Sequence, residues 1–205
     1  MKLAIFGATG GTGRLVAEKA LAQGYEVSAL VRDPGRLALV HDRLTVVTGN
    51  VLDTVAVEQT LNGAGAAIIS LGNTSNNPDY IVSEGTRVIL AAMKKLAVPR
   101  VVVVSSIGVG DSKDQVPFFF KMLMKSALKK PMEDKERQEA AVMASGLDWI
   151  IVRPGGLTDN PATGSYKAGL DKTIVAGQVS RADVADFVLR QVTDDTYLRK
   201  TPAIS

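Results

Sequence analysis

Seven residues near the N-terminus, Gly7 to Gly13 in the sequence GATGGTG, contain four glycines and two threonines. They follow a short apolar run and precede a stretch with helical periodicity. Glycine tolerates the backbone angles of a tight turn and lets the main chain approach a ligand closely. A helix that follows such a turn offers free N–H groups and a partial positive charge to an anion. The pattern predicts a phosphate-binding loop, and a glycine-rich turn without a ligand is the alternative.

The loop has the spacing G-x-x-G-x-x-G rather than the commoner G-x-G-x-x-G. Its position between a strand and a helix is nevertheless the context in which such a loop binds the pyrophosphate of a dinucleotide. We expect Gly13 to let the helix pack closely on the sheet, and the two threonines to add hydroxyl donors. The predicted cofactor contacts of this loop are Gly7, Thr9, Gly10, Gly11, Thr12 and Gly13.

Two arginines follow the second expected strand, in the sequence LVRDPGRL. Enzymes that use NAD usually have an acidic residue here, which binds the ribose 2′-hydroxyl. Arg32 and Arg36 instead suit a 2′-phosphate, through charge-assisted hydrogen bonds. Asp33 is an alternative ribose ligand, unless it starts a turn with Pro34, and Arg36 on a solvated helix face is the alternative for that residue. The sequence therefore predicts NADP(H) as the cofactor.

Strand-like apolar runs alternate with helical patterns along the whole chain. Several runs are apolar without alternation, as in strands buried on both faces of a parallel sheet. The expected strands are 3–6, 26–31, 44–47, 66–70, 100–105 and 149–152, and the expected helices are 12–23, 53–62, 80–97, 132–145 and 181–193. Ser180, three residues before Asp183, marks the start of the last helix. The pattern predicts an α/β protein with a Rossmann-like, doubly wound parallel sheet in one domain, residues 1–205.

Composition excludes several classes of function. The 205 residues include no cysteine and a single histidine, His41, so neither a disulfide framework nor a site with several histidine ligands is expected. The net charge of +3 comes from scattered residues rather than from a basic stripe typical of nucleic-acid binding. No signal peptide or membrane span is apparent. We expect a cytoplasmic protein without a metal, a nucleic-acid partner or a membrane partner.

Five stretches together resemble the atypical short-chain dehydrogenases with an NAD(P)H-binding domain, in particular the bacterial relatives of flavin reductase/biliverdin reductase B. They are FGATGGTG, ALVRDPGRL, GNVLD, SEGTRVILAAMK and SGLDWIIVRPGGLTDNPATGSY. The resemblance covers essentially the whole chain. It implies that Asn50 and Val51 lie beside the adenine, although most relatives have Asp at the position of Asn50. It also implies that Leu71 and Gly72 line the path of the cofactor.

The resemblance places further residues at the nicotinamide end of the cofactor. Relatives have a serine near the nicotinamide where Ser105 and Ser106 end the fifth strand. Ser106 is the candidate for orienting the nicotinamide or donating to the substrate, and a capped strand end is its alternative. The segment RPGGL, from Arg153 to Leu157, would close over the nicotinamide amide group. Its expected cofactor contacts are Pro154, Gly155 and Leu157.

The tyrosine of the Y-x-x-x-K motif of typical short-chain dehydrogenases is missing. Lys135, with Glu139 four residues later, resembles the lysine of the family, but Pro131 stands at the tyrosine position. Proline has no proton to donate, so an isolated ketone would lose its general acid. Lys135 either binds the cofactor ribose or is a solvated helix lysine. We predict that Ser106 and Lys135 flank the reacting face.

These features predict a reductase that passes hydride from NADPH directly to a conjugated, flavin-like or quinone-like small molecule. Biliverdin-reducing relatives carry histidines near their substrate, and the absence of histidine near RPGGL argues against a tetrapyrrole. A non-catalytic NADP(H) sensor, as in the regulators of nitrogen metabolite repression that share this fold, is the alternative. An epimerase or dehydratase would need the tyrosine and a larger C-terminal domain. We expect a monomer or a weak dimer.

The segment VPFFFKMLMKSALKK, residues 116–130, combines three phenylalanines with two methionines and four lysines. Its apolar side chains predict a helix packed on the sheet. A lid over a flat acceptor is the second interpretation, with Phe118, Phe119 and Phe120 as its apolar wall. A helix lying on a membrane surface is the third.

Overall fold

Strands and helices alternate in the computed structural model, which describes residues 1–73, 79–118, 121–122, 126 and 128–205. The six expected strands are all present, as β1 Lys2–Phe6, β2 Glu26–Val31, β3 Leu44–Thr48, β4 Ala66–Ile69, β5 Arg100–Val104 and β6 Asp148–Pro154. The five expected helices are also present, as α1 Gly11–Ala22, α2 Thr54–Leu61, α3 Ile81–Lys95, α5 Lys129–Met143 and α6 Arg181–Arg190.

Eight described strands form the main sheet, in the order β3-β2-β1-β4-β5-β6-β10-β8, where β8 is Ala168–Gly169 and β10 is Ala203–Ile204. Strands β1 to β6 pair in parallel. The central strand β1 pairs with β2 on one edge and with β4 on the other. The chain therefore winds outward from β1 in both directions, which confirms the doubly wound Rossmann-like sheet.

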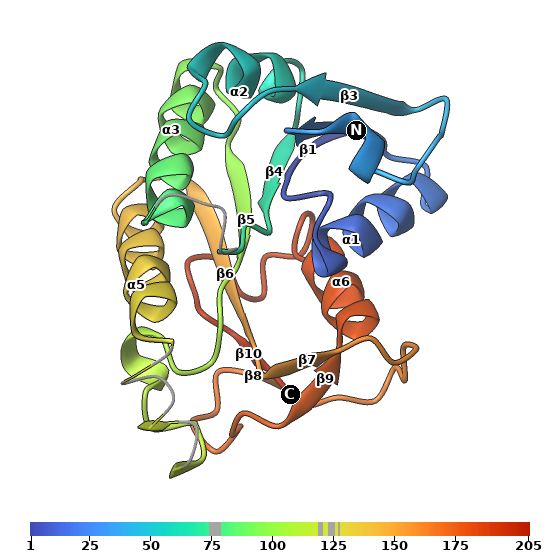
Figure 1. Cartoon of the computed structure of the whole chain (residues 1–205). Coiled ribbons are helices and arrows are strands. Elements are labelled where there is room, and N and C mark those ends of the chain that lie inside the picture. The colour runs from blue at the N-terminus through green and yellow to red at the C-terminus, as the bar shows by residue number, and fades with distance from the viewer. Residues whose placement is uncertain (74–78, 119–120, 123–125, 127) are drawn as a thin grey trace.

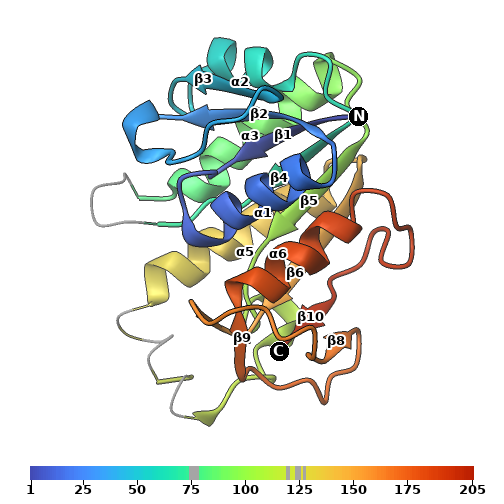
Figure 2. The same ribbon diagram turned by 90° about the vertical axis from the view of Figure 1, so that its right-hand side faces the viewer.

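Each face of the sheet is covered by helices, so successive residues of a central strand enter two different cores. In β1, Leu3 and Ile5 pack in the core under α1 and α6, whereas Ala4 and Phe6 pack in the core under α2, α3 and α5. Figures 1 and 2 show these two helical layers on opposite faces. Burial on both faces explains why the central strands β1, β4 and β5 are almost wholly apolar rather than alternating.

The sequence did not predict four short strands in the C-terminal part, β7 Gly156–Thr158, β8 Ala168–Gly169, β9 Gln178–Ser180 and β10 Ala203–Ile204. β7 and β9 pair in parallel as a separate small sheet, while β10 extends the main sheet beside β6. Each has only two or three residues, so none has a periodicity that can be recognised. The small sheet matters because it joins the end of β6 to the start of α6.

The helix boundaries follow from local backbone chemistry. α5 begins at Lys129, three residues before the expected start, because Pro131 falls in the first turn, where its missing N–H is not needed. α3 begins at Ile81 because Tyr80 has a left-handed backbone, with φ of 61°. The start of α6 is confirmed: Ser180 Oγ accepts a bond of 2.9 Å from the N–H of Asp183 and donates one of 2.7 Å to its carboxylate.

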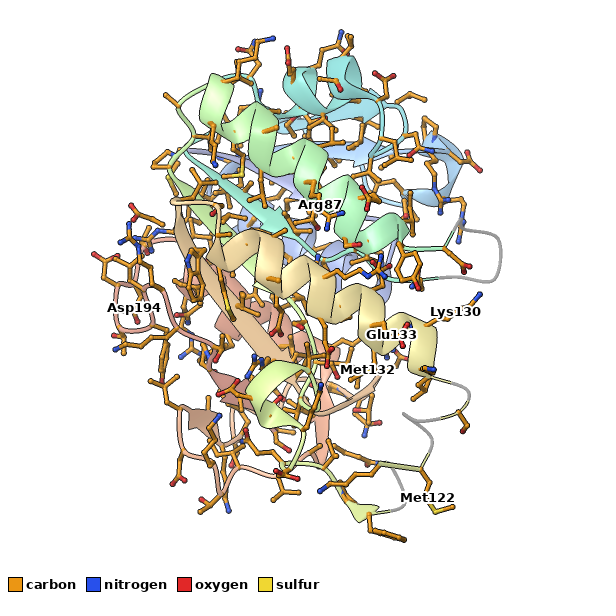
Figure 3. The ribbon with its side chains drawn as sticks, turned by 90° about the vertical axis from the view of Figure 1, so that its left-hand side faces the viewer. Arg87, Met122, Lys130, Met132, Glu133 and Asp194 are labelled. Carbon is orange, nitrogen blue, oxygen red and sulfur yellow. The ribbon has the colours of Figure 1, made fainter. Side chains whose placement is uncertain are left out.

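Much of the segment 116–130 lies outside the described residues, including Phe119 and Phe120, so its predicted helix or lid is not assigned. Val116 is buried with Ile107 and Ile174, whereas Phe118 is 79% exposed. Figure 3 shows α3 and α5 side by side, and Met122 lies apart from both helices.

Replacing Ser180 with alanine removes the side-chain cap of α6. We expect the free energy of unfolding to fall by about 0.5–2 kcal/mol, the usual cost of losing such a cap. Urea unfolding measures it, and the exposed, non-capping Ser165→Ala should change it by less than about 0.5 kcal/mol. Equal effects of the two substitutions would show that the cap does not stabilise the helix.

Candidate functional site

A cavity of about 390 Å³ opens at the carboxyl ends of the central parallel strands. It lies where the order of the sheet reverses, between the loops that follow β1 and β4. Loops diverge at such a point and leave a crevice, which is where doubly wound sheets bind their ligands. Residues after β1, β2, β3, β4 and β5 all line this cavity.

Two glycines of the first loop are required by the fold itself. Gly7 has φ of 98°, and a Cβ atom there would lie 2.4 Å from the carbonyl oxygen of Ser70. A Cβ atom at Gly13 would lie 2.2 Å from the carbonyl oxygen of Gly7. The close contact of Gly13 is therefore with the loop's own main chain, and Gly13 does not line the cavity.

Gly10 is different, because an added Cβ there would make a tight contact but would not overlap another atom of the protein. Its φ of −83° suits any residue, and the nearest atom to an added Cβ is the Gly7 carbonyl oxygen at 3.3 Å. Gly10 is also the N-cap of α1, whose first turn has neither a side-chain cap nor an acidic residue. The start of α1 therefore has free N–H groups and borders the cavity, and both features suit an anion such as a pyrophosphate. Thr9, Gly11 and Thr12 also line the cavity.

Arg181, the first residue of α6, lines the same part of the cavity and was not predicted from the sequence. Its side chain lies over Gly11, since a Cβ atom there would come within 2.7 Å of its Cδ. Its guanidinium donates to the carboxylate of Asp159 at 2.8 Å, and that carboxylate is 89% exposed. Arg181 is far from the glycine loop in sequence, so no local pattern links the two.

Arg32 and Arg36 both line the cavity beyond the end of β2. Asp33 lies between them but does not line the cavity. Its carboxylate instead accepts from the N–H of Gly35 at 3.0 Å and caps the short helical turn Pro34–Arg36. Of the two interpretations of Asp33, the geometry favours the start of the turn. Two arginines thus border the end of the cavity where the adenosine ribose is expected.

The loop after β3 forms the adjacent wall with Asn50 and Val51. Asn50 Oδ1 accepts from the N–H of Leu52 at 3.0 Å, which holds this loop in a turn. Val51 packs against α3 at Gly85, where a Cβ atom would lie only 2.5 Å from its methyl group. Leu71 and Gly72, after β4, continue the wall toward β5. Further lining residues that the sequence did not single out are Phe6, Leu30, Val31, Gly49, Ser70, Asn73, Ile81 and Val104.

Lys135 of α5 lines the cavity where β4 and β5 end. Its Nζ donates to the carbonyl oxygens of Val104 at 2.7 Å and Leu71 at 3.2 Å, so the side chain joins the ends of the two strands. Burial lowers the pKa of Lys135 to about 8, against the nearby charges of Glu139 and Asp134. This lysine is therefore not a solvated residue of the helix surface.

Ser105 also lines the cavity, and its hydroxyl enters a buried polar network. Ser105 Oγ donates to Glu139 at 2.6 Å, and Glu139 pairs with Arg153 through two further hydrogen bonds of 3.0 and 2.6 Å. Burial opposes the charge of Arg153, but hydrogen bonds from Arg153 to Glu139 and Asp111 raise its pKa overall. Hydrogen bonds from Lys172 and Arg153 lower the pKa of Asp111 to about 2. Arg153 is thus part of the scaffold behind the cavity.

Three of the residues expected near the nicotinamide do not line the cavity. Ser106 Oγ instead donates to the carbonyl of Ile107 at 3.0 Å. Pro154 ends β6, and a Cβ atom at Gly155 would lie 2.6 Å from the carbonyl oxygen of Gly177. Only Leu157, in β7, reaches the cavity from this segment.

Two tyrosines that could supply a proton, Tyr80 and Tyr166, and the described phenylalanine of the 116–130 segment, Phe118, lie outside the cavity. Tyr80 stacks under the guanidinium of Arg137, 3.8 Å from the ring centre. The Tyr166 hydroxyl accepts from Arg190 at 3.0 Å, and its ring packs edge-on against Phe187. Neither tyrosine lines the cavity, and Phe118 does not line it either.

Comparisons with known proteins agree with this geometry. The profile of a family described as NAD(P)H-binding matches residues 7–195. A protein of Aspergillus terreus named reductase pytE is 30% identical over 241 aligned residues, which cover 93% of this chain and 90% of that protein. The structure of ChuY, an anaerobilin reductase from Escherichia coli O157:H7, superposes with a TM-score of 0.85 and 27% identity, covering 100% of this chain and 96% of ChuY.

A short-chain dehydrogenase/reductase from Veillonella parvula, solved in complex with NADP, shares the fold with a TM-score of 0.80 and 19% identity, over 100% of this chain and 94% of that one. Within the described part of the chain, no helix is long and apolar enough to cross a membrane.

The glycine contacts predict opposite outcomes for two substitutions in one loop. Gly10→Val should lower the free energy of unfolding by only about 1 kcal/mol, because valine is a poorer N-cap than glycine but its Cβ would not overlap the main chain. It should also abolish NADPH binding, because the branched side chain enters the cavity. Gly13→Ala should lower stability by roughly 1–3 kcal/mol, because its Cβ overlaps the Gly7 carbonyl. Calorimetry with thermal unfolding tests both, and normal NADPH affinity in a folded Gly10→Val protein would refute the contact.

The environment of Lys135 predicts a titration near pH 8. A ¹³C NMR titration of labelled lysines should show one side chain that loses its proton there, and Lys135→Arg should remove that signal. The unfolded chain holds this proton up to about pH 10.5, the ordinary value. The free energy of unfolding, relative to Lys135→Met, should therefore rise with pH between about 8 and 10.5. Observation of no lysine titrating below its ordinary range would contradict the burial.

Proposed function

The chain belongs to the NAD(P)H-binding family, and from that premise we propose that it is a reductase that binds NADP(H) and transfers hydride directly to a conjugated, flavin-like or quinone-like acceptor. The observation that carries the proposal is the cavity at the point where the strand order of the sheet reverses. At one of its ends lie two arginines, in the middle an open helix start, and at the other end Lys135 and Ser105.

The order of the strands supports one direction for the cofactor. Arg32 and Arg36 follow β2, and Asn50 and Val51 follow β3, so these residues would hold the adenosine half. Gly10 and the free N–H groups of α1 would hold the pyrophosphate, and Arg181 would add a cation there. The residues at the ends of β4 and β5 would then hold the nicotinamide half. Lys135, held by two carbonyl oxygens, is placed to bind the ribose next to the nicotinamide.

Preference for NADP(H) rests on the two arginines. A planar guanidinium binds a phosphate through charge-assisted hydrogen bonds, and the ribose of NAD offers only hydroxyl groups at this place. The only acidic residue between the arginines, Asp33, caps its own turn. Among the described residues that line the cavity, none is acidic, so this edge of the lining is cationic.

The bound cofactor supplies the hydride, two electrons and one hydrogen nucleus, and becomes oxidised as the acceptor is reduced. A conjugated acceptor spreads the incoming charge over its ring and then takes one proton from water. The protein's contribution is to hold donor and acceptor face to face. Pro131 stands four residues before Lys135, and Tyr80 and Tyr166 lie outside the cavity. These positions support a reaction that does not use a tyrosine acid.

The similar proteins named above support a reductase without fixing its acceptor. Because ChuY is named as an anaerobilin reductase, anaerobilin belongs in any panel of acceptors tested, beside flavins and quinones. The missing histidines near Leu157 argue against the tetrapyrroles that biliverdin-reducing relatives accept. A non-catalytic sensor remains the second candidate, because the same cavity would bind NADP(H) without turnover.

Arg32→Ala should weaken NADPH binding about tenfold or more, because a charge-assisted contact is worth roughly 1.5–3 kcal/mol. NADH binding should be nearly unchanged, since NADH has no 2′-phosphate. Calorimetry with both cofactors gives the comparison. Arg14→Ala is a matched control, because Arg14 pairs with Glu18 on α1 and does not line the cavity. Equal losses for both cofactors in Arg32→Ala would show that this arginine does not recognise the phosphate.

The choice of acceptor tests the proposed reaction. NADPH oxidation, followed at the nicotinamide absorbance band, should be measurable with flavins or quinones. It should be negligible with small aliphatic ketones, which lose the ~10²–10⁴-fold contribution of a general acid. Rapid reduction of a ketone would refute direct transfer and require an unrecognised acid. Tight NADPH binding without turnover of any acceptor would favour the sensor.

A further inference from the structure

The buried network behind the cavity controls which way one hydroxyl group points. Ser105 follows β5 and borders the cavity, Glu139 lies on α5 and Arg153 lies on β6. The three residues are 5% or less exposed. They form a chain of short hydrogen bonds in which Glu139 stands between the hydroxyl and the guanidinium.

The chemistry of these groups assigns the hydrogen atoms. The guanidinium of Arg153 only donates, and it faces both oxygens of Glu139. A carboxylate held in this way only accepts. The hydrogen between Ser105 and Glu139, whose oxygens are 2.6 Å apart, must therefore come from Ser105. A buried pair of this kind holds its geometry firmly, because breaking it leaves an uncompensated charge.

A serine hydroxyl has a single hydrogen and two lone pairs. Since the hydrogen of Ser105 is directed to Glu139, only lone pairs remain for the cavity. The neighbouring donors point largely elsewhere: Ser106 donates to Ile107, and two of the three hydrogens of the Lys135 ammonium are directed to Leu71 and Val104. This polarity is opposite to that of a carbonyl-reducing site, where an O–H group must donate to the oxygen that gains negative charge.

We propose that Ser105 Oγ is an obligatory hydrogen-bond acceptor at the reacting end of the cavity, and that it selects a ligand carrying an N–H group there. This inference rests on the proposed function, because the proposed function assigns the nicotinamide to the end of the cavity that Ser105 borders. The N–H group has two possible sources, the carboxamide of the nicotinamide or the ring of the acceptor. Glu139 and Arg153 are positioning residues, because they act on the ligand only through Ser105.

Two pairs of ligands distinguish the sources. NADPH is compared with reduced 3-acetylpyridine adenine dinucleotide phosphate, which has an acetyl group in place of the carboxamide, by calorimetric binding. Riboflavin is compared with 3-methylriboflavin, which lacks the ring N–H, by kcat/KM at saturating NADPH. The wild-type protein should prefer the N–H ligand of at least one pair by roughly two- to tenfold, the effect of a single neutral hydrogen bond.

Ser105→Ala should abolish that preference, because it removes the accepting oxygen. Ser106→Ala, at the same strand end but outside the cavity, should keep it. A lost preference in the first pair assigns the carboxamide, and a lost preference in the second assigns the acceptor. Ratios that are unchanged in Ser105→Ala would overturn the proposal. If this variant does not fold, the wild-type ratios decide, and no preference in either pair overturns it.

The binding comparison needs no turnover, so it separates this inference from the proposed reaction. If the protein discriminates the two dinucleotides through Ser105 but reduces no acceptor, the proposed reductase activity is refuted and the role of Ser105 is supported. If the protein reduces flavins equally well with and without the ring N–H, and binds both dinucleotides equally, the proposed reductase activity is supported. The role of Ser105 is then refuted.

Discussion

The close parallel pairing of β1 with β4 is the constraint on which the rest of the site depends. It brings Gly7 so near to Ser70 that a single Cβ atom would lie 2.4 Å from a carbonyl oxygen. The sheet reverses its winding at this pair, with β2 and β3 on one side and β5 and β6 on the other. The loops therefore diverge here, and groups from both halves face one cavity. Gly7 and Gly13 maintain this geometry, whereas Gly10 leaves it open to a ligand.

A second constraint acts from behind the cavity. Arg153 is the largest fully buried side chain of the described residues, and its charge is balanced by Glu139 and Asp111. Such a pair is costly to desolvate, so its value here lies in the orientation it imposes rather than in net stability. It fixes β6 to α5 and directs the hydroxyl hydrogen of Ser105 to Glu139, so that only lone pairs of Ser105 Oγ remain for the cavity. The polarity of the reacting end thus follows from the scaffold.

The parts of the molecule with local patterns were predictable from the sequence. Apolar runs predicted the six parallel strands, and these runs are nearly continuous in β1, β4 and β5, which are buried on both faces. The glycine spacing predicted the loop between β1 and α1. The parts made by distant residues were not. Arg181 reaches the loop from α6, and the RPGGL segment was expected to close over the cofactor, whereas Arg153 pairs with Glu139 and only Leu157 lines the cavity. No periodicity or spacing encodes such contacts, and β7 to β10 are too short to recognise.

The central claim is that hydride moves directly from the dihydronicotinamide to the acceptor. The most direct test is single-turnover oxidation of NADPH deuterated separately at each of the two C4 positions, with a flavin or quinone as acceptor. If transfer is direct and the cavity holds the ring in one orientation, deuterium at one position will slow the reaction and deuterium at the other will not. A rate that is insensitive to deuterium at both positions, while chemistry limits the turnover, would contradict direct hydride transfer.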